Sequence, residues 1–147
     1  MAVADVSSLD IAHLIQVAVG PVFLLSGIGV TLGVFTTRLA RIVDRARAAE
    51  SETARDPRHE TLLKSRLEVL AKRSRYISAA ITLATLSALL VATTVVLLFA
   101  NAILNLRLAI AIAVIFAAST LSLTGALLVF LIEVRLATVS LRIGGHI

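Results

Sequence analysis

The chain contains no cysteine among its 147 residues. Disulfides, thiolate metal sites and thiol chemistry are therefore excluded. The sequence also has no His-Glu-x-x-His pattern and no glycine-rich nucleotide-binding loop, which are the short motifs of common metal and nucleotide sites. We accordingly expect a protein that is not an enzyme, with no catalytic residue, no metal site and no cofactor.

Charge is also missing, from three long stretches. Asp, Glu, Lys and Arg are all absent from Ile11–Thr37, Tyr76–Leu106 and Leu108–Ile132. Each stretch exceeds the ~20 residues that a helix needs to cross a hydrocarbon core of ~30 Å. Hydrophobic residues make up 59% of the chain and the mean hydropathy is +0.99, which is typical of membrane proteins and not of soluble domains. We predict an all-α integral membrane protein with three transmembrane helices.

Basic residues are absent before Arg38. A cleaved signal peptide begins with a basic region and has a short apolar core, whereas here Asp5 and Asp10 precede a long apolar stretch. We therefore interpret the first stretch as a retained span.

The basic residues that are present gather in one place. Eleven of the fourteen Lys and Arg residues, and six acidic residues, lie between Arg38 and Arg75. The positive-inside rule places such a short basic segment in the cytoplasm. The predicted order is an outer amino end (1–10), helix 1 (11–37), a basic cytoplasmic helical hairpin (38–75), helix 2 (76–104), an outer turn (105–107), helix 3 (108–132) and a cytoplasmic tail (133–147).

A sequence pI near 11.1 is also typical of nucleic-acid-binding proteins. Here the basic residues flank spans, so their position in the membrane explains them, and we expect no nucleic-acid partner.

The segment 38–75 carries two apolar stripes at helical spacing. Between them, Ser51–Asp56 has no stripe, and Asp56-Pro57 is a favourable helix start. We expect helix 1 to continue into this segment, to turn near 51–56 and to return, with the stripes facing each other or a neighbouring subunit. The first stripe consists of Leu39, Ile42, Val43 and Ala46, and the second of Leu63, Leu67 and Leu70.

The first span is unusually polar along one face. At 100° per residue, His13, Gln16, Gly20 and Gly27 lie within about 60° of one another, with Asp10 to the side. Pro21 removes a backbone donor and predicts a kink or a break. Polar groups within a membrane usually face a bundle interior or water, although near its outer end they can simply meet the headgroup region. As candidate pore-lining residues we take Asp10, His13, Gln16, Gly20, Pro21 and Gly27.

A second face of this span carries small residues: Ser26, Gly29 and Gly33. Gly29 and Gly33 form a GxxxG pattern, which lets two helix backbones approach closely in lipid. These three residues are candidate helix contacts in a homo-oligomer. The alternative is that they are ordinary small residues of a span.

Basic residues also flank the predicted inner boundary of the first two spans. Each contributes about 1 kcal/mol near an anionic leaflet, which serves general anchoring or a dedicated lipid site. The candidate headgroup contacts are Arg38, Arg41, Lys72, Arg73 and Arg75.

Three runs of this sequence resemble a known family. They are IAHLIQVAVGPVFLLSGIG (11–29), RLARIVDRAR (38–47) and AITLATLSALLV (80–91), and they resemble the bacterial family called domain of unknown function 2721. The resemblance covers nearly the whole chain and implies a small, three-span bacterial membrane protein. It implies no activity.

Two functions remain open from the residues. The first is a homo-oligomeric pore in the bacterial inner membrane, lined by the polar face of the first span and conducting ions. The second is a non-conducting membrane adaptor whose basic hairpin binds a partner protein or anionic lipid. They differ in whether the face around His13 and Gln16 meets water or packed protein.

Overall fold

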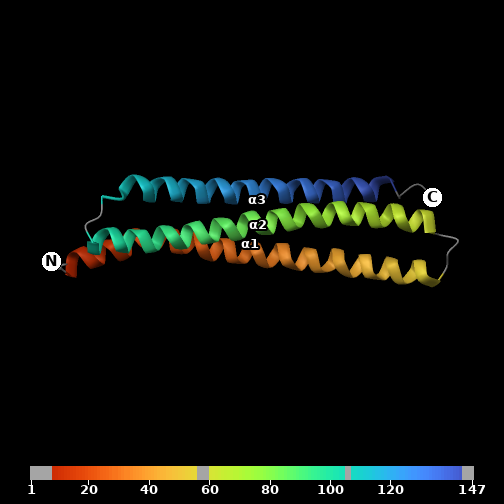
Figure 1. Cartoon of the computed structure of the whole chain (residues 1–147), viewed down its shortest axis with the longest axis horizontal. Coiled ribbons are helices and arrows are strands. Elements are labelled where there is room, and N and C mark those ends of the chain that lie inside the picture. Colours follow the sequence, from red (N-terminus) through yellow and green to blue (C-terminus); the bar gives the residue numbers. More distant parts are fainter. Residues whose placement is uncertain (1–7, 56–59, 105–106, 144–147) are drawn as a thin grey trace. The chain divides into compact units, whose positions relative to one another are not determined.

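The residues that the computed structural model describes form three helices, labelled in Figure 1. Helix α1 spans Ser8–Arg55, α2 spans Glu60–Leu104 and α3 spans Ala109–Ile143. The structure describes residues 8–55, 60–104 and 107–143, and the side chains of 11–51, 67–104 and 107–136. No strand occurs in these ranges, so the predicted all-helical class is confirmed.

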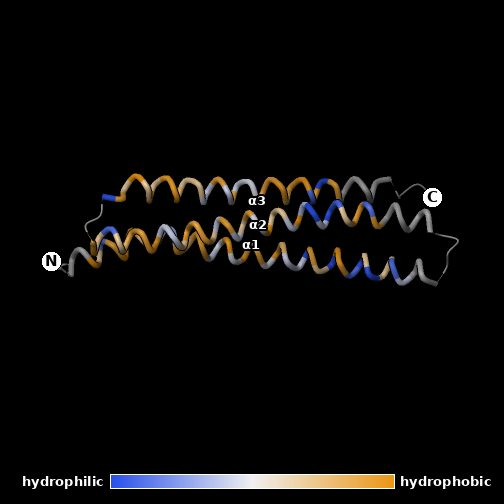
Figure 2. Tube along the Cα trace, in the orientation of Figure 1, coloured by the Kyte–Doolittle hydropathy of each residue, from blue (hydrophilic) through white to orange (hydrophobic). Residues whose placement is uncertain are grey.

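Each helix contains a stretch that is long and apolar enough to cross a membrane: Ile11–Ser51, Leu67–Leu104 and Ala109–Leu136. Figure 2 shows these stretches mostly in orange, with hydrophilic positions gathered toward the carboxyl end of α1 and the amino end of α2. The prediction of a multi-pass membrane protein with three long apolar helices is therefore confirmed.

Two details differ from the expectation. α1 is helical through Arg55, so Ser51–Arg55 forms its last turns instead of a bend. α1 also continues through Pro21, so the proline causes no break. Asp56-Pro57 lies outside the described residues.

The chain divides into two compact units, each of which includes part of every helix. Unit 1 comprises Met1–Thr31 and Leu83–Thr124, and unit 2 comprises Leu32–Thr82 and Gly125–Ile147.

In unit 1, hydroxyl groups join α2 to α3. Ser87 Oγ donates to the carbonyl of Ser119 at 2.7 Å, and Ser122 Oγ donates to the carbonyl of Leu83 at 2.8 Å. Such bonds are favoured in apolar surroundings because an unpaired hydroxyl there is costly. At the end of α2, Asn101 Oδ1 accepts a hydrogen bond from the backbone N–H of Leu108 at 3.0 Å. This bond satisfies a donor next to the start of α3.

From Ile28 on, the buried residues of each helix recur at intervals of seven or of alternating three and four. This spacing places the buried residues of each helix along one face of that helix, here called its seam. Many of the residues on it are small, which allows close packing in lipid. The seam of α1 includes Ile28, Phe35 and Ile42, that of α2 includes Ile77, Ala80, Ala84, Ser87, Val91 and Thr94, and that of α3 includes Ser119, Ala126 and Glu133.

Candidate functional site

Glu133 of α3 is the only charged side chain that is buried among those that the structure describes, with 0% exposure. Ser119, Ala126 and Glu133 are buried at seven-residue intervals along α3, so they lie on one face of this helix. Burying a carboxylate costs several kcal/mol unless charged partners and hydrogen bonds compensate it. A buried Glu133 therefore requires charged hydrogen-bond donors close to its carboxylate.

Two arginines from the other helices supply the compensation. Arg73 of α2 donates from Nε and Nη2 to Oε1 of Glu133, at 3.1 and 2.8 Å. Arg38 of α1 donates from Nη1 to Oε2 at 3.3 Å. Both carboxylate oxygens thus have donors, and one glutamate links all three helices within unit 2.

The two arginines are held unequally. The Arg73 side chain is 14% exposed and makes the two shorter bonds, whereas the Arg38 side chain is 41% exposed and makes one longer bond. The Arg38 guanidinium also lies over the ring of Phe130, 5.0 Å from its centroid. The Phe130 ring in turn packs against Phe35, with centroids 4.6 Å apart. Arg73 is the tight partner of Glu133, and Arg38 is the loose one.

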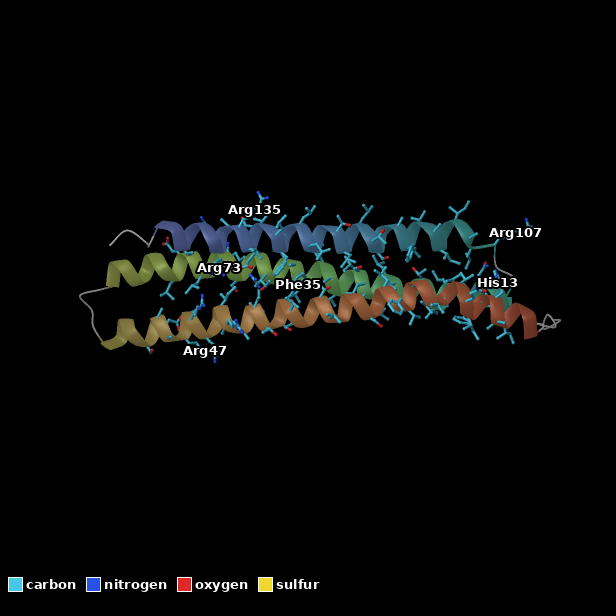
Figure 3. All side chains as sticks on the ribbon, turned by 180° about the vertical axis from the view of Figure 1, so that it is seen from behind. His13, Phe35, Arg47, Arg73, Arg107 and Arg135 are labelled. Carbon is cyan, nitrogen blue, oxygen red and sulfur yellow. The ribbon has the colours of Figure 1, made fainter. Side chains whose placement is uncertain are left out.

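Figure 3 labels four residues of unit 2, which differ in the direction of their side chains. Phe35 and Arg73 lie among the helices of the unit, whereas the side chains of Arg47 and Arg135 extend outward. The buried site is therefore distinct from the outward-pointing arginines of the same unit.

A pocket of about 200 Å³ opens beside the glutamate. On α1, Arg38, Arg41 and Arg45 share one face because they are three and four residues apart. The four arginines and one glutamate of the lining leave a net charge of +3. The lining residues are Arg38, Arg41, Ile42, Arg45, Arg73 and Glu133.

Arg41 and Arg45 are exposed, and within the described part of the chain neither forms an ion pair. The pocket is suited to bind anions, since the planar, forked guanidinium matches the oxygens of phosphate and carboxylate.

The pocket residues lie at the ends of the uncharged stretches. Arg38 is the first charged residue after 11–37, and Glu133 is the first after 108–132. Arg73 lies three residues before the stretch that begins at Tyr76. In a membrane, residues that terminate a span lie near headgroup depth.

Three of the five predicted headgroup contacts, Arg38, Arg41 and Arg73, line this pocket. The other two, Lys72 and Arg75, are exposed on α2 and do not line it. Sequence reasoning missed Arg45 because it lies a turn farther from the apolar stretch.

The predicted pore-lining face is open in this chain. His13, Gln16, Gly20 and Gly27 are exposed and Pro21 is partly exposed, while the side chain of Asp10 lies outside the described residues. A Cβ added at Gly20 or Gly27 would meet no atom within 4 Å. Its role as a pore lining stays a prediction.

The predicted helix-contact face is open as well. A Cβ added at Gly29 or Gly33 would meet no atom within 4 Å, and Ser26 Oγ donates only to the carbonyl of Val22, at 3.4 Å. A close contact at these residues therefore needs a second molecule, and it also stays a prediction.

The two apolar stripes expected in 38–75 meet in unit 2. Ile42, Val43 and Ala46 of α1 line the same groove of about 450 Å³ as Leu67 and Leu70 of α2. These residues of the two stripes thus face each other. Leu39 does not line this groove, and the side chain of Leu63 lies outside the described residues.

Sequence reasoning missed the role of Glu133, which it assigned to the start of a cytoplasmic tail. The signal that identifies it is the seven-residue spacing of Ser119, Ala126 and Glu133. That spacing places the glutamate on the same face as two small residues of the predicted span.

Comparisons with known proteins identify a family. No curated protein and no solved structure matches the chain. The sequence model of a family described as "Protein of unknown function (DUF2721)" matches residues 18–143, a range that contains the seams of the three helices, both arginines and Glu133. Since the match covers most of the sequence, the chain belongs to the DUF2721 family.

Proposed function

We propose that this protein is a non-enzymatic membrane adaptor that holds the phosphate of an anionic lipid in the basic pocket of unit 2. The observation that carries the proposal is the convergence of Arg38, Arg41, Arg45 and Arg73 on one pocket with a net charge of +3. A lipid phosphate brings one or two negative charges and several acceptor oxygens, and the pocket offers matching donors. A volume of about 200 Å³ is several times the roughly 30 Å³ that one water occupies in the liquid.

A lipid is favoured over a soluble anion because of where the pocket lies. Arg38 and Glu133 terminate two of the uncharged stretches and Arg73 lies close to the start of the third, so a membrane-inserted chain presents the pocket near headgroup depth. The positive-inside rule turns the segment 38–75 toward the cytoplasm of a bacterial cell. That side of a membrane carries anionic lipids, and basic pockets between spans bind their headgroups.

The test measures lipid selectivity with the full chain in nanodiscs of phosphatidylcholine. Spin-labelled phosphatidylglycerol and phosphatidylcholine are added, and the motionally restricted fraction of each gives its association with the protein. We expect phosphatidylglycerol to be preferred, and Arg41→Gln or Arg45→Gln each to weaken that preference about fivefold, which corresponds to about 1 kcal/mol per basic residue.

Arg47→Gln is the matched control, because Arg47 is an exposed arginine of the same helix that does not line this pocket. An equal loss in this variant would show diffuse attraction in place of a site. Competition by soluble inorganic phosphate distinguishes a general phosphate site from a lipid site. If wild-type protein shows no preference between the two lipids, the proposal fails.

A second candidate function is the homo-oligomeric pore, and one observation favours it. His13 and Gln16 are exposed on α1 beside an open Gly20, and exposed polar groups in a span favour contact with water or another subunit over lipid. Replacing Gln16 by Leu and by Glu in purified protein should then change a current measured across planar bilayers. The absence of any current, or a current unchanged by both replacements, rejects the pore.

A further inference from the structure

We infer that Glu133 is an internal competitor of the bound phosphate, and that Arg38 exchanges between the two anions. This inference rests on the proposed lipid site and specifies how its affinity is set. Glu133 thereby keeps the pocket formed in the absence of lipid and limits how tightly it binds lipid.

The exchange follows from the unequal grip on the carboxylate. Arg73 donates two bonds to Oε1, so Glu133 keeps a charged partner when Arg38 leaves. Arg38 gives up a single bond of 3.3 Å to Oε2. Its side chain is 41% exposed, whereas that of Arg73 is 14% exposed, so Arg38 is the arginine that an incoming anion reaches.

The surroundings of Arg38 favour a rotation of its guanidinium group over a large displacement of the side chain. Its guanidinium lies over the Phe130 ring at 5.0 Å, and a cation keeps this attraction while it turns above the ring face. Arg41 and Arg45 lie on the same face of α1 and line the same pocket. A phosphate held by those two arginines is therefore within the pocket that Arg38 already lines.

A purely structural glutamate predicts the opposite result from a competing one. If Glu133 only supports the fold, Glu133→Gln leaves the pocket less ordered and lipid binding equal or weaker. If Glu133 competes, the neutral amide releases Arg38 and binding becomes tighter. One more available cation corresponds to about a fivefold gain in association of phosphatidylglycerol.

The experiment measures association of spin-labelled phosphatidylglycerol with the full chain in phosphatidylcholine nanodiscs, for wild type, Glu133→Gln, Arg38→Gln and the double variant. The expected result is about a fivefold gain for Glu133→Gln and no gain when Arg38 is also replaced. Glu50→Gln is the control, because it removes one exposed negative charge from unit 2. Soluble inorganic phosphate, added to the same samples, tests whether the gain belongs to phosphate in general.

A second measurement uses the wild-type chain and so does not depend on the folding of a variant. On addition of phosphatidylglycerol, the NMR signal of the Arg38 Nε–H group should shift while that of Arg73 stays. Suppose that wild type prefers phosphatidylglycerol. If Glu133→Gln then shows no gain, or Glu50→Gln shows an equal gain, competition by Glu133 is overturned and the proposed lipid site is unaffected. A shift at Arg73 with none at Arg38 overturns the competition as well. Loss of lipid preference in wild type overturns the site itself.

Discussion

Replacing Arg73 by Gln should destabilise the protein far more than replacing Arg38 by Gln. Arg73 is the better-buried partner and makes two of the three hydrogen bonds to Glu133. Removing one partner of a buried ion pair costs about 3–5 kcal/mol, because the remaining charge is left uncompensated. Arg38 is 41% exposed, so water takes over part of its role, and its loss should cost about 1 kcal/mol.

The assay follows thermal unfolding in micelles of an uncharged detergent that contain no anionic lipid, so that binding of an anionic headgroup adds nothing to stability. Because the chain has no cysteine, Ala48→Cys and Val69→Cys can carry a fluorophore pair for energy transfer. Both positions are exposed and belong to α1 and α2 of unit 2. The loss of energy transfer then reports separation of these two helices.

A third variant tests the physical reason. Buried ion pairs replaced by apolar residues of similar volume are often neutral or stabilising, so Arg73→Met combined with Glu133→Leu should recover most of the stability lost in Arg73→Gln. Equal costs for Arg38→Gln and Arg73→Gln would refute the unequal grip. Failure of the apolar pair to recover stability would refute the claim that an uncompensated charge causes the loss.

Three further outcomes are expected. Ser51→Cys should resist an impermeant thiol reagent in intact cells and Arg107→Cys should react, because the basic segment is predicted to be cytoplasmic; reaction at Ser51→Cys alone would reverse the threading. Gly29→Leu combined with Gly33→Leu should lower the particle mass in nanodiscs without lowering stability, since neither added side chain meets an atom of this chain within 4 Å at its Cβ. Asn101→Ala should cost about 1 kcal/mol in the same unfolding assay, as the loss of a side chain that caps a helix end does; no change would show that water replaces its bond to Leu108.

The three helices could be predicted from the sequence because hydropathy and charge are averaged over many residues. Three uncharged stretches, each longer than a bilayer requires, leave little choice of secondary structure. The extension of α1 into the basic segment was also predictable, since its apolar stripe continues at helical spacing. The residue at which α1 ends was less predictable, because capping preferences move a helix boundary by a few residues.

The glutamate–arginine site could not be predicted in full, because it depends on the register between helices. The spacing of Ser119, Ala126 and Glu133 marks one face of α3, but it does not say which residues of α1 and α2 lie opposite. Arg38, Arg41, Arg73 and Lys72 are similar in sequence terms, since all lie at the end of a span. Only the three-dimensional arrangement selects Arg38 and Arg73 as the partners.

Stability alone does not explain why the chain has an ion pair between Arg73 and Glu133. If an apolar pair in place of Arg73 and Glu133 keeps the helices together, then stability alone does not require a charged seam at that level. What the charged seam adds is a fixed guanidinium at Arg73, a loosely held one at Arg38, and a pocket whose net charge remains +3. The apolar double variant should fold, and its preference for phosphatidylglycerol should change little. Replacing Arg73 removes one cation from the pocket, and replacing Glu133 releases another at Arg38. The number of cations available to the phosphate should therefore stay nearly the same. Complete loss of the preference for phosphatidylglycerol would instead show that phosphate binds to Arg73 directly, and that Glu133 orients the Arg73 side chain.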